Sequence, residues 1–276
     1  MKIEQLAINS VSNLPHGLEA NLDAYAAAGF KNVEFYLKHV WDYIKKGHSP
    51  KDVRAMLDAR GLKCIGGFET IVKCFAPDDV RRKNHATVRQ NAELLKELGG
   101  SILVVGTDGP NPAQRKAGDP IKAMAQAFND VARSIERTGV TLCIEFNWSP
   151  YVKSLRTACE IARLSRRKNV GVLFDPAHYH CTPTKMEHID GASVPFIRYV
   201  HVNDMRNKPG ELSDCNADRA LPGKGCLPLR ELFGRIEQHG YRGYFSIEMF
   251  DQELWNMPPM KSARIMYDSV VQLCSS

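Results

Sequence analysis

The stretch Val170-Gly171-Val172-Leu173-Phe174-Asp175 is a short apolar run that ends abruptly in a carboxylate. Short apolar runs bounded by polar residues are typical of buried strands in a parallel sheet. Other runs of this form close on a carboxylate or an imidazole: Leu142-Cys143-Ile144-Glu145, Tyr199-Val200-His201 and Phe245-Ser246-Ile247-Glu248. Each of these predicted strands therefore ends in a polar side chain.

Short runs of the same kind recur along the whole chain and alternate with segments of helical period. Eight strands are predicted, at residues 3–9, 32–35, 63–67, 102–106, 141–145, 170–174, 197–202 and 243–248. Helices are predicted between them, for example at residues 18–28, 51–60 and 121–138, each followed by a glycine that can end a helix. Eight strand–helix units in 276 residues predict an α/β fold, a (β/α)8 barrel that residues 1–276 form as a single domain.

An open, doubly wound sheet is the alternative architecture. Such sheets commonly bind nucleotides through a glycine-rich turn after the first strand. Here the first strand leads into Asn9-Ser10-Val11-Ser12-Asn13, and the chain contains no G-x-x-x-x-G-K-[ST] motif. Both observations favour the closed barrel and argue against nucleotide binding.

The composition is that of an ordinary globular protein, with 43% hydrophobic and 25% charged residues. The net charge is +6, but basic clusters such as Arg81-Arg82-Lys83 fall on predicted helices, so we expect solvated faces and no nucleic-acid partner. The eight cysteines include no Cys-x-x-Cys pair and are expected to be reduced core thiols. Because no signal peptide or membrane-length apolar run is present, we expect a cytoplasmic protein without a membrane partner.

The polar strand ends should meet at one place, because the active site of such a barrel lies at the C-terminal ends of its strands. One such residue could simply cap a helix or face solvent. Several carboxylates packed together, however, repel one another unless a cation neutralises them. Carboxylate and imidazole ligands suit one divalent ion, Mn²⁺, Mg²⁺, Co²⁺ or Zn²⁺. The predicted metal ligands are Glu145, Asp175, His201 and Glu248.

The second half of the chain, roughly residues 140–260, resembles the xylose-isomerase-like TIM barrels in the order and spacing of its motifs. The stretches that carry the resemblance are Cys143-Ile144-Glu145, Asp175-Pro176-Ala177-His178, Tyr199-Val200-His201-Val202-Asn203-Asp204, Arg219-Ala220-Leu221-Pro222-Gly223-Lys224-Gly225 and 240–248. This family includes sugar isomerases, ketose 3-epimerases, inosose isomerases, dehydratases and apurinic-site endonucleases. The chain is most similar to 2-keto-myo-inositol (inosose) isomerases, through Asp175, His178 and His180 and an acidic and aromatic segment at 250–255.

The resemblance implies roles beyond the metal ligands. Glu145 and Glu248 would also act as the catalytic acid/base pair, and His178 and Arg219 would hold substrate oxygens. Further candidates could touch the substrate or could serve only in packing and structural hydrogen bonds; these are Glu34, Glu69, Trp148, Trp255 and His180.

The predicted activity is isomerisation or epimerisation of a small polyhydroxy ketone or sugar. A metal that chelates a ketone oxygen acidifies the neighbouring C–H and stabilises the enediolate, and flanking carboxylates can move the proton. A dehydratase, which would need only one more acid group, remains an alternative. Two subfamilies are disfavoured, because Asn147 replaces a histidine of 3-dehydroshikimate dehydratases and the glutamate that ketose 3-epimerases carry after Glu145 is missing.

Two other functions of such barrels are less consistent with the sequence. An apurinic-site endonuclease would need extra histidines for a three-metal cluster, but the corresponding stretches are Phe68-Glu69, Gly106-Thr107-Asp108 and Asp218-Arg219-Ala220. A non-catalytic sugar-binding barrel is disfavoured by the complete ligand set. A homo-oligomer could form through residues 255–260.

Overall fold

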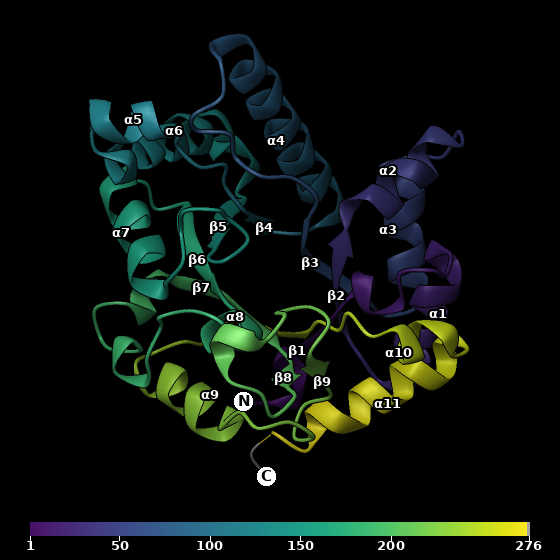
Figure 1. Ribbon diagram of the computed structural model, residues 1–276. Coiled ribbons are helices and arrows are strands. Elements are labelled where there is room, and N and C mark those ends of the chain that lie inside the picture. Colours follow the sequence, from purple (N-terminus) through teal and green to yellow (C-terminus); the bar gives the residue numbers. More distant parts are fainter. Residues whose placement is uncertain (275–276) are drawn as a thin grey trace.

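Eight parallel strands close into a barrel in the computed structural model, which describes residues 1–274 (Figure 1). The strands follow one another around the barrel in chain order, and the last one pairs with both the first and the seventh. The predicted (β/α)8 barrel is therefore confirmed; residues 275–276 of the predicted domain lie outside the described residues. The barrel strands are β1 Leu6–Asn9, β2 Asn32–Tyr36, β3 Lys63–Phe68, β4 Ile102–Val105, β5 Thr141–Glu145, β6 Val170–Phe174, β7 Ile197–Val202 and β10 Phe245–Ile247.

The helices form an outer ring around the strands (Figure 1). The longer helices turn an apolar face inward, as α7 does with Leu155, Ala158 and Ile161. Gly29 and Gly99 end α1 and α4 with φ angles of 110° and 87°, the left-handed conformation expected at these positions. The helices are α1 Leu18–Ala28, α2 Leu37–Lys45, α3 Pro50–Ala59, α4 Asp78–Leu98, α5 Pro112–Ala117, α6 Pro120–Ser134, α7 Leu155–Ser165, α8 Pro176–His180, α9 Leu229–Gln238, α10 Gln252–Asn256 and α11 Pro259–Val271.

Several predicted boundaries differ from the observed ones. The strand predicted at 3–9 begins only at Leu6, because Ile3–Gln5 forms a 3-10 turn in which the Gln5 amide donates to the Lys2 carbonyl. The helix predicted at 121–138 ends at Ser134, whose hydroxyl donates to the Val131 carbonyl and competes with the helical bonds. The loop after β7 contains an unpredicted antiparallel pair, β8 Asp204–Met205 and β9 Arg219–Ala220.

The alternation of side chains along each strand separates two apolar layers. Val200 and Val202 of β7 belong to the layer between strands and helices, whereas Tyr199 belongs to the cluster that fills the barrel. His201, two residues after Tyr199, therefore also points into the barrel. Successive side chains of a strand face opposite ways, so the apolar pattern of β7 fixes the direction of its histidine.

The cysteines were predicted to be reduced core thiols, and no membrane-spanning segment was predicted. All eight cysteines are free, but the description of them as core thiols is wrong for Cys226, which is exposed. Among residues 1–274, no helix is both long and apolar enough to cross a membrane.

Candidate metal centre

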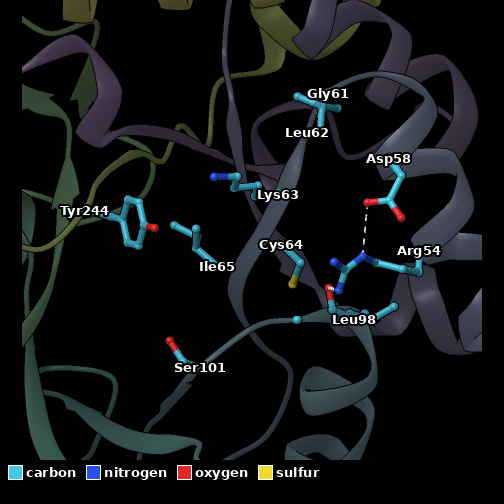
Figure 2. A pocket seen from close by; sticks show the side chains of 11 residues that line it. Arg54, Asp58, Gly61, Leu62, Lys63, Cys64, Ile65, Leu98, Ser101 and Tyr244 are labelled. Carbon is cyan, nitrogen blue, oxygen red and sulfur yellow. Dashed lines mark hydrogen bonds and ion pairs between the residues drawn. The ribbon is translucent and has the colours of Figure 1, made fainter.

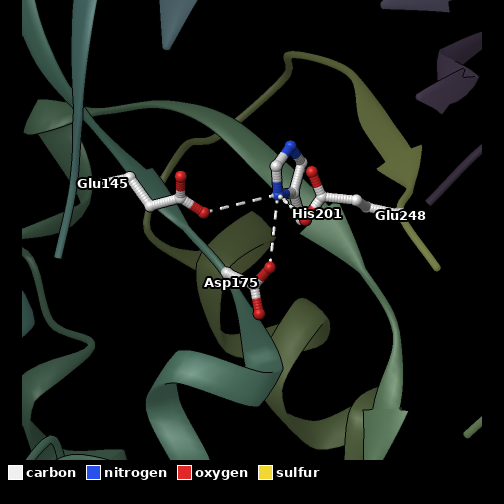
Figure 3. A group of neighbouring side chains, drawn as sticks. All are labelled: Glu145, Asp175, His201 and Glu248. Carbon is white, nitrogen blue, oxygen red and sulfur yellow. Dashed lines mark hydrogen bonds and ion pairs between the residues drawn. The ribbon is translucent and has the colours of Figure 1, made fainter. Parts of the chain in front are cut away.

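Four side chains from neighbouring strand ends converge on one point in the mouth of the barrel (Figure 3). Glu145 is the last residue of β5, Asp175 and Glu248 directly follow β6 and β10, and His201 lies in β7. Each offers one ligand atom, and these atoms all lie within 4.8 Å of one another. Nδ1 of His201 is 3.8, 3.2 and 3.1 Å from oxygens of Glu145, Asp175 and Glu248, respectively. The four predicted ligands are thus brought together.

The charges of this cluster suit a bound cation. All four residues are buried, and the exposed fraction is largest for Glu145, at 7%. The buried guanidinium of Arg219 lies nearby, with nitrogens 3.3 Å from Asp175 and 2.8 Å from Glu248. Three desolvated carboxylates this close repel one another, and a divalent ion held by three oxygens and one imidazole nitrogen would offset that repulsion. Among residues 1–274, no other group of acidic, histidine or cysteine side chains has this geometry.

The two glutamates of the centre differ in acidity although both are buried. Burial raises the pKa of Glu145, and the hydrogen bond from His178 only partly opposes it. Burial also raises the pKa of Glu248, but the charges of His201 and Arg219 outweigh that effect and leave the pKa below its usual value. Environments that separate two carboxylates in this way are typical of acid/base sites.

Side-chain amides hold two of the ligands in place. Asn9, at the end of β1, donates to Glu248 at 2.9 Å, and Asn203, just after β7, donates to both oxygens of Asp175 at 3.2 and 3.1 Å. Neither asparagine was singled out from the sequence as a site residue. Their positions at strand ends are the signal that could have identified them, because strand ends surround the mouth of the barrel.

The other two ligands each pair with a side chain that sequence reasoning considered. Nε2 of His178 lies 3.1 Å from Oε1 of Glu145. Burial lowers the pKa of His178, but Asp175 and Glu145 outweigh it and raise the pKa to about 10. Glu34, which the sequence placed at the mouth or in a structural role, is fully buried within the barrel, with Oε2 3.2 Å from Nε2 of His201.

A cavity of about 290 Å³ opens in front of the centre. His178 and Arg219 line it together with Glu145 and Glu248, so the predicted substrate-binding pair and the predicted acid/base pair face the same space. Their contact with substrate stays a prediction. The lining residues are Phe68, Glu145, Asn147, Trp148, His178, Cys215, Asn216, Arg219, Glu248 and Phe250.

Of the further substrate-contact candidates, Trp148 lines this cavity, whereas Glu69, Trp255 and His180 do not. Glu69 accepts a hydrogen bond from Asn91, and the Trp255 indole donates to the carbonyl of Val11. Nε2 of His180 lies 2.9 Å from the carbonyl of Lys208. Each of the three thus has a structural hydrogen bond, as the alternative reading of the sequence allowed.

A second cavity, of about 370 Å³, lies at the opposite end of the barrel, where β3 begins (Figure 2). Arg54 spans its edge, with Nε 3.2 Å from Asp58 and Nη1 donating to the Leu98 carbonyl at 3.3 Å. None of the unpartnered buried polar atoms of residues 1–274 belongs to its lining. No residue of the metal cluster lines this cavity, whereas Glu145 and Glu248 both line the smaller one.

Residues 22–268 match the family described as Xylose isomerase-like TIM barrel. The chain belongs to this family. An inosose isomerase from Bacillus velezensis is 28% identical over 260 residues, which cover 87% of this chain and 91% of the relative. An inosose dehydratase from Serratia proteamaculans is 23% identical over 249 residues, 81% of this chain and 79% of the relative.

A solved structure supports the fold assignment. The crystal structure of the IOLI protein with a binding zinc atom superposes with a TM-score of 0.87 at 20% sequence identity. The match covers 98% of this chain and 97% of that one. The family assignment and the buried cluster together identify a protein of the metal-dependent sugar isomerase and epimerase class with a metal-site arrangement of Glu145, Asp175, His201 and Glu248.

Proposed function

We propose that this protein is a divalent-metal-dependent isomerase or epimerase of a small cyclic polyhydroxy ketone of the inosose type. The observation that carries the proposal is the convergence of three carboxylates on Nδ1 of His201 beside a cavity that two of them also line. The name of the Bacillus velezensis relative supports the substrate class. Zinc is the ion in the structurally similar IOLI protein, and Mn²⁺, Mg²⁺ and Co²⁺ suit the same ligands.

The two glutamates are placed to move a proton. Glu145 and Glu248 reach the cavity from β5 and β10, which are three strands apart around the barrel. A substrate carbon between them would have a carboxylate on either side, so one can remove a proton and the other can return one to the neighbouring carbon or the opposite face. A divalent ion held here would supply Lewis acidity toward the substrate carbonyl.

The cavity walls favour a compact ring. Phe68 and Trp148 meet edge to face, with ring centroids 6.1 Å apart. Phe250 also lines the cavity, and the Arg219 guanidinium lies 5.0 Å from the centroid of the Phe250 ring. Aromatic faces pack against the C–H faces of a polyol ring, while His178 and Arg219 offer N–H donors to its oxygens. A volume of about 290 Å³ accommodates one such ring.

Dehydration is the second candidate function, and the position of His178 favours it. Its imidazole faces the cavity next to Glu145, where it could donate a proton to a departing hydroxyl after a carboxylate has taken the proton from the carbon next to the carbonyl. The products would be an alkene and water, so the atoms balance without a further reactant. The Serratia proteamaculans relative is named for this type of reaction.

Proton NMR in D2O distinguishes the two functions. The protein, loaded with Mg²⁺ or Zn²⁺, is incubated with inososes, ketoses and 3-dehydroshikimate. Isomerisation predicts deuterium next to the carbonyl and a new isomer without loss of water, and a new alkene signal would instead establish dehydration. If no substrate across the panel exchanges or reacts, the proposed enzyme function is wrong.

A further inference from the structure

The buried carboxylate of Glu34 has no role in the proton transfer proposed above, yet it lies directly behind the metal centre. Its side chain comes from β2, on the far side of the barrel from β6, and none of it is exposed. Three side chains surround it. Tyr199 donates to Oε2 at 3.0 Å, Ser246 donates to the same oxygen at 2.9 Å, and Nε2 of His201 lies 3.3 and 3.2 Å from its two oxygens.

The partners of Glu34 can all donate a hydrogen bond to it. Within the described part of the chain, its one ion-pair partner is His201. Its carboxylate oxygens can accept from the tyrosine and serine hydroxyls and from an imidazole N–H, which satisfies all four groups.

The contact between Glu34 and Nε2 also decides which nitrogen of His201 is free. If Glu34 accepts the Nε2–H, the neutral imidazole has a bare Nδ1, and Nδ1 is the atom that faces the other ligands. If Nε2 had to accept a hydrogen bond, the proton of the neutral ring would sit on Nδ1 and block the metal position.

From this geometry we propose that Glu34 is a positioning residue that fixes the tautomer of His201, keeping Nδ1 free for the divalent ion. The inference rests on the proposed metal site. Carboxylates that accept the second N–H of a ligating histidine typically change metal affinity 10–100-fold when mutated. Glu34 therefore tunes the centre without touching either the ion or the substrate.

The decisive variant is Glu34→Gln, which keeps the size of the side chain but can present an N–H to Nε2 of His201. The matched control is Ser246→Ala, which removes one hydroxyl from the same carboxylate and leaves the contact with His201 in place. Zn²⁺ is titrated into metal-free protein by calorimetry, and ¹⁵N NMR of labelled histidines identifies the protonated nitrogen of His201. Thermal melts verify that each variant is folded.

We expect Glu34→Gln to weaken Zn²⁺ binding by about 10–100-fold. Ser246→Ala should change it much less. In zinc-loaded wild type, His201 should show a protonated Nε2 and a zinc-bound Nδ1. Unchanged affinity in Glu34→Gln, or a zinc-bound Nε2 in wild type, overturns the inference while the metal site stands. If the glutamine variant does not fold, the ¹⁵N spectrum of zinc-loaded wild type still shows which nitrogen of His201 binds zinc and so tests the inference. Wild type that binds no Zn²⁺ overturns both the inference and the metal site.

Discussion

Glu145 and Glu248 show how two residues of one type acquire different properties within a few ångströms. Glu145 accepts a hydrogen bond from His178, whereas Glu248 is held by Arg219 and Asn9. The charges of His201 and Arg219 together outweigh the effect of burial on the pKa of Glu248, whereas burial outweighs the effect of His178 on the pKa of Glu145. This difference suits Glu248 to the role of base and Glu145 to that of acid.

We predict that Glu145→Gln and Glu248→Gln each lower kcat by at least 10²–10⁴-fold, the usual contribution of a general acid or base. Both variants should remain folded, because glutamine has the same volume. The measurement is steady-state turnover together with circular dichroism and metal content. Glu69→Gln is the matched control, since Glu69 bonds to Asn91 away from the cavity. Near-normal turnover in either active-site variant would contradict the acid/base assignment.

The protonation of His201 predicts a pH dependence of metal binding. Burial lowers its pKa, but Glu248 and Glu34 outweigh burial and raise the pKa well above the usual value in the metal-free centre. The ion needs a bare Nδ1, so binding at neutral pH must release a proton. The affinity should therefore weaken as pH falls, by about tenfold per unit for one proton. Calorimetry in buffers of different ionisation enthalpy checks this, and a binding heat that is independent of the buffer would exclude the linkage.

The four ligands could be predicted from the sequence because each ends an apolar run, and barrel closure brings such ends together. The residues that hold the ligands were only partly predictable, because His178, Arg219 and Glu34 were candidates but Asn9 and Asn203 were not. Asn9 and Asn203 also lie at strand ends, but an asparagine there is as consistent with a turn as with a site. Glu34 contacts His201 across the barrel, a distance of 167 residues along the chain, and no local pattern encodes that contact.

At the scale of elements, the loop after β7 brings Arg219 to the centre, and Asp204 organises that loop. The carboxylate of Asp204 accepts backbone N–H groups of Met205, Gly223, Gly225 and Leu227. Only glycine fits at position 225, because a Cβ there would lie 2.3 Å from Oδ1 of Asp204. The sequence showed the glycines and the long loop, but the strands β8 and β9 have two residues each and are too short for any periodicity to predict.

Asp204→Ala should loosen this loop and displace Arg219. Because several backbone N–H groups lose their acceptor, we expect a loss of about 1–3 kcal/mol in the free energy of unfolding, together with a higher KM. Urea denaturation and substrate titration measure the two effects. Asp214→Ala removes an exposed carboxylate from the same loop and should cost less. Equal effects of the two substitutions would show that Asp204 does not organise the loop.

At the scale of the whole molecule, the eightfold alternation of strands and helices was the most predictable feature. This alternation depends on many residues at once. Wrong predictions of single boundaries, at the 3-10 turn Ile3–Gln5 and at Ser134, therefore did not change the predicted architecture. The barrel also explains why the chemistry occupies one end. The ligands enter at the C-terminal ends of β5, β6, β7 and β10, whereas the cavity beside Arg54 at the other end has no such convergence.

The most direct test of the metal centre is anomalous X-ray diffraction from crystals soaked in Mn²⁺, recorded above and below the manganese absorption edge. We predict one strong peak per chain, at roughly 2.0–2.2 Å from Nδ1 of His201 and from the oxygens of its three carboxylate partners. A peak elsewhere, for example in the cavity beside Arg54, or no peak at a Mn²⁺ concentration that supports turnover, would contradict the account.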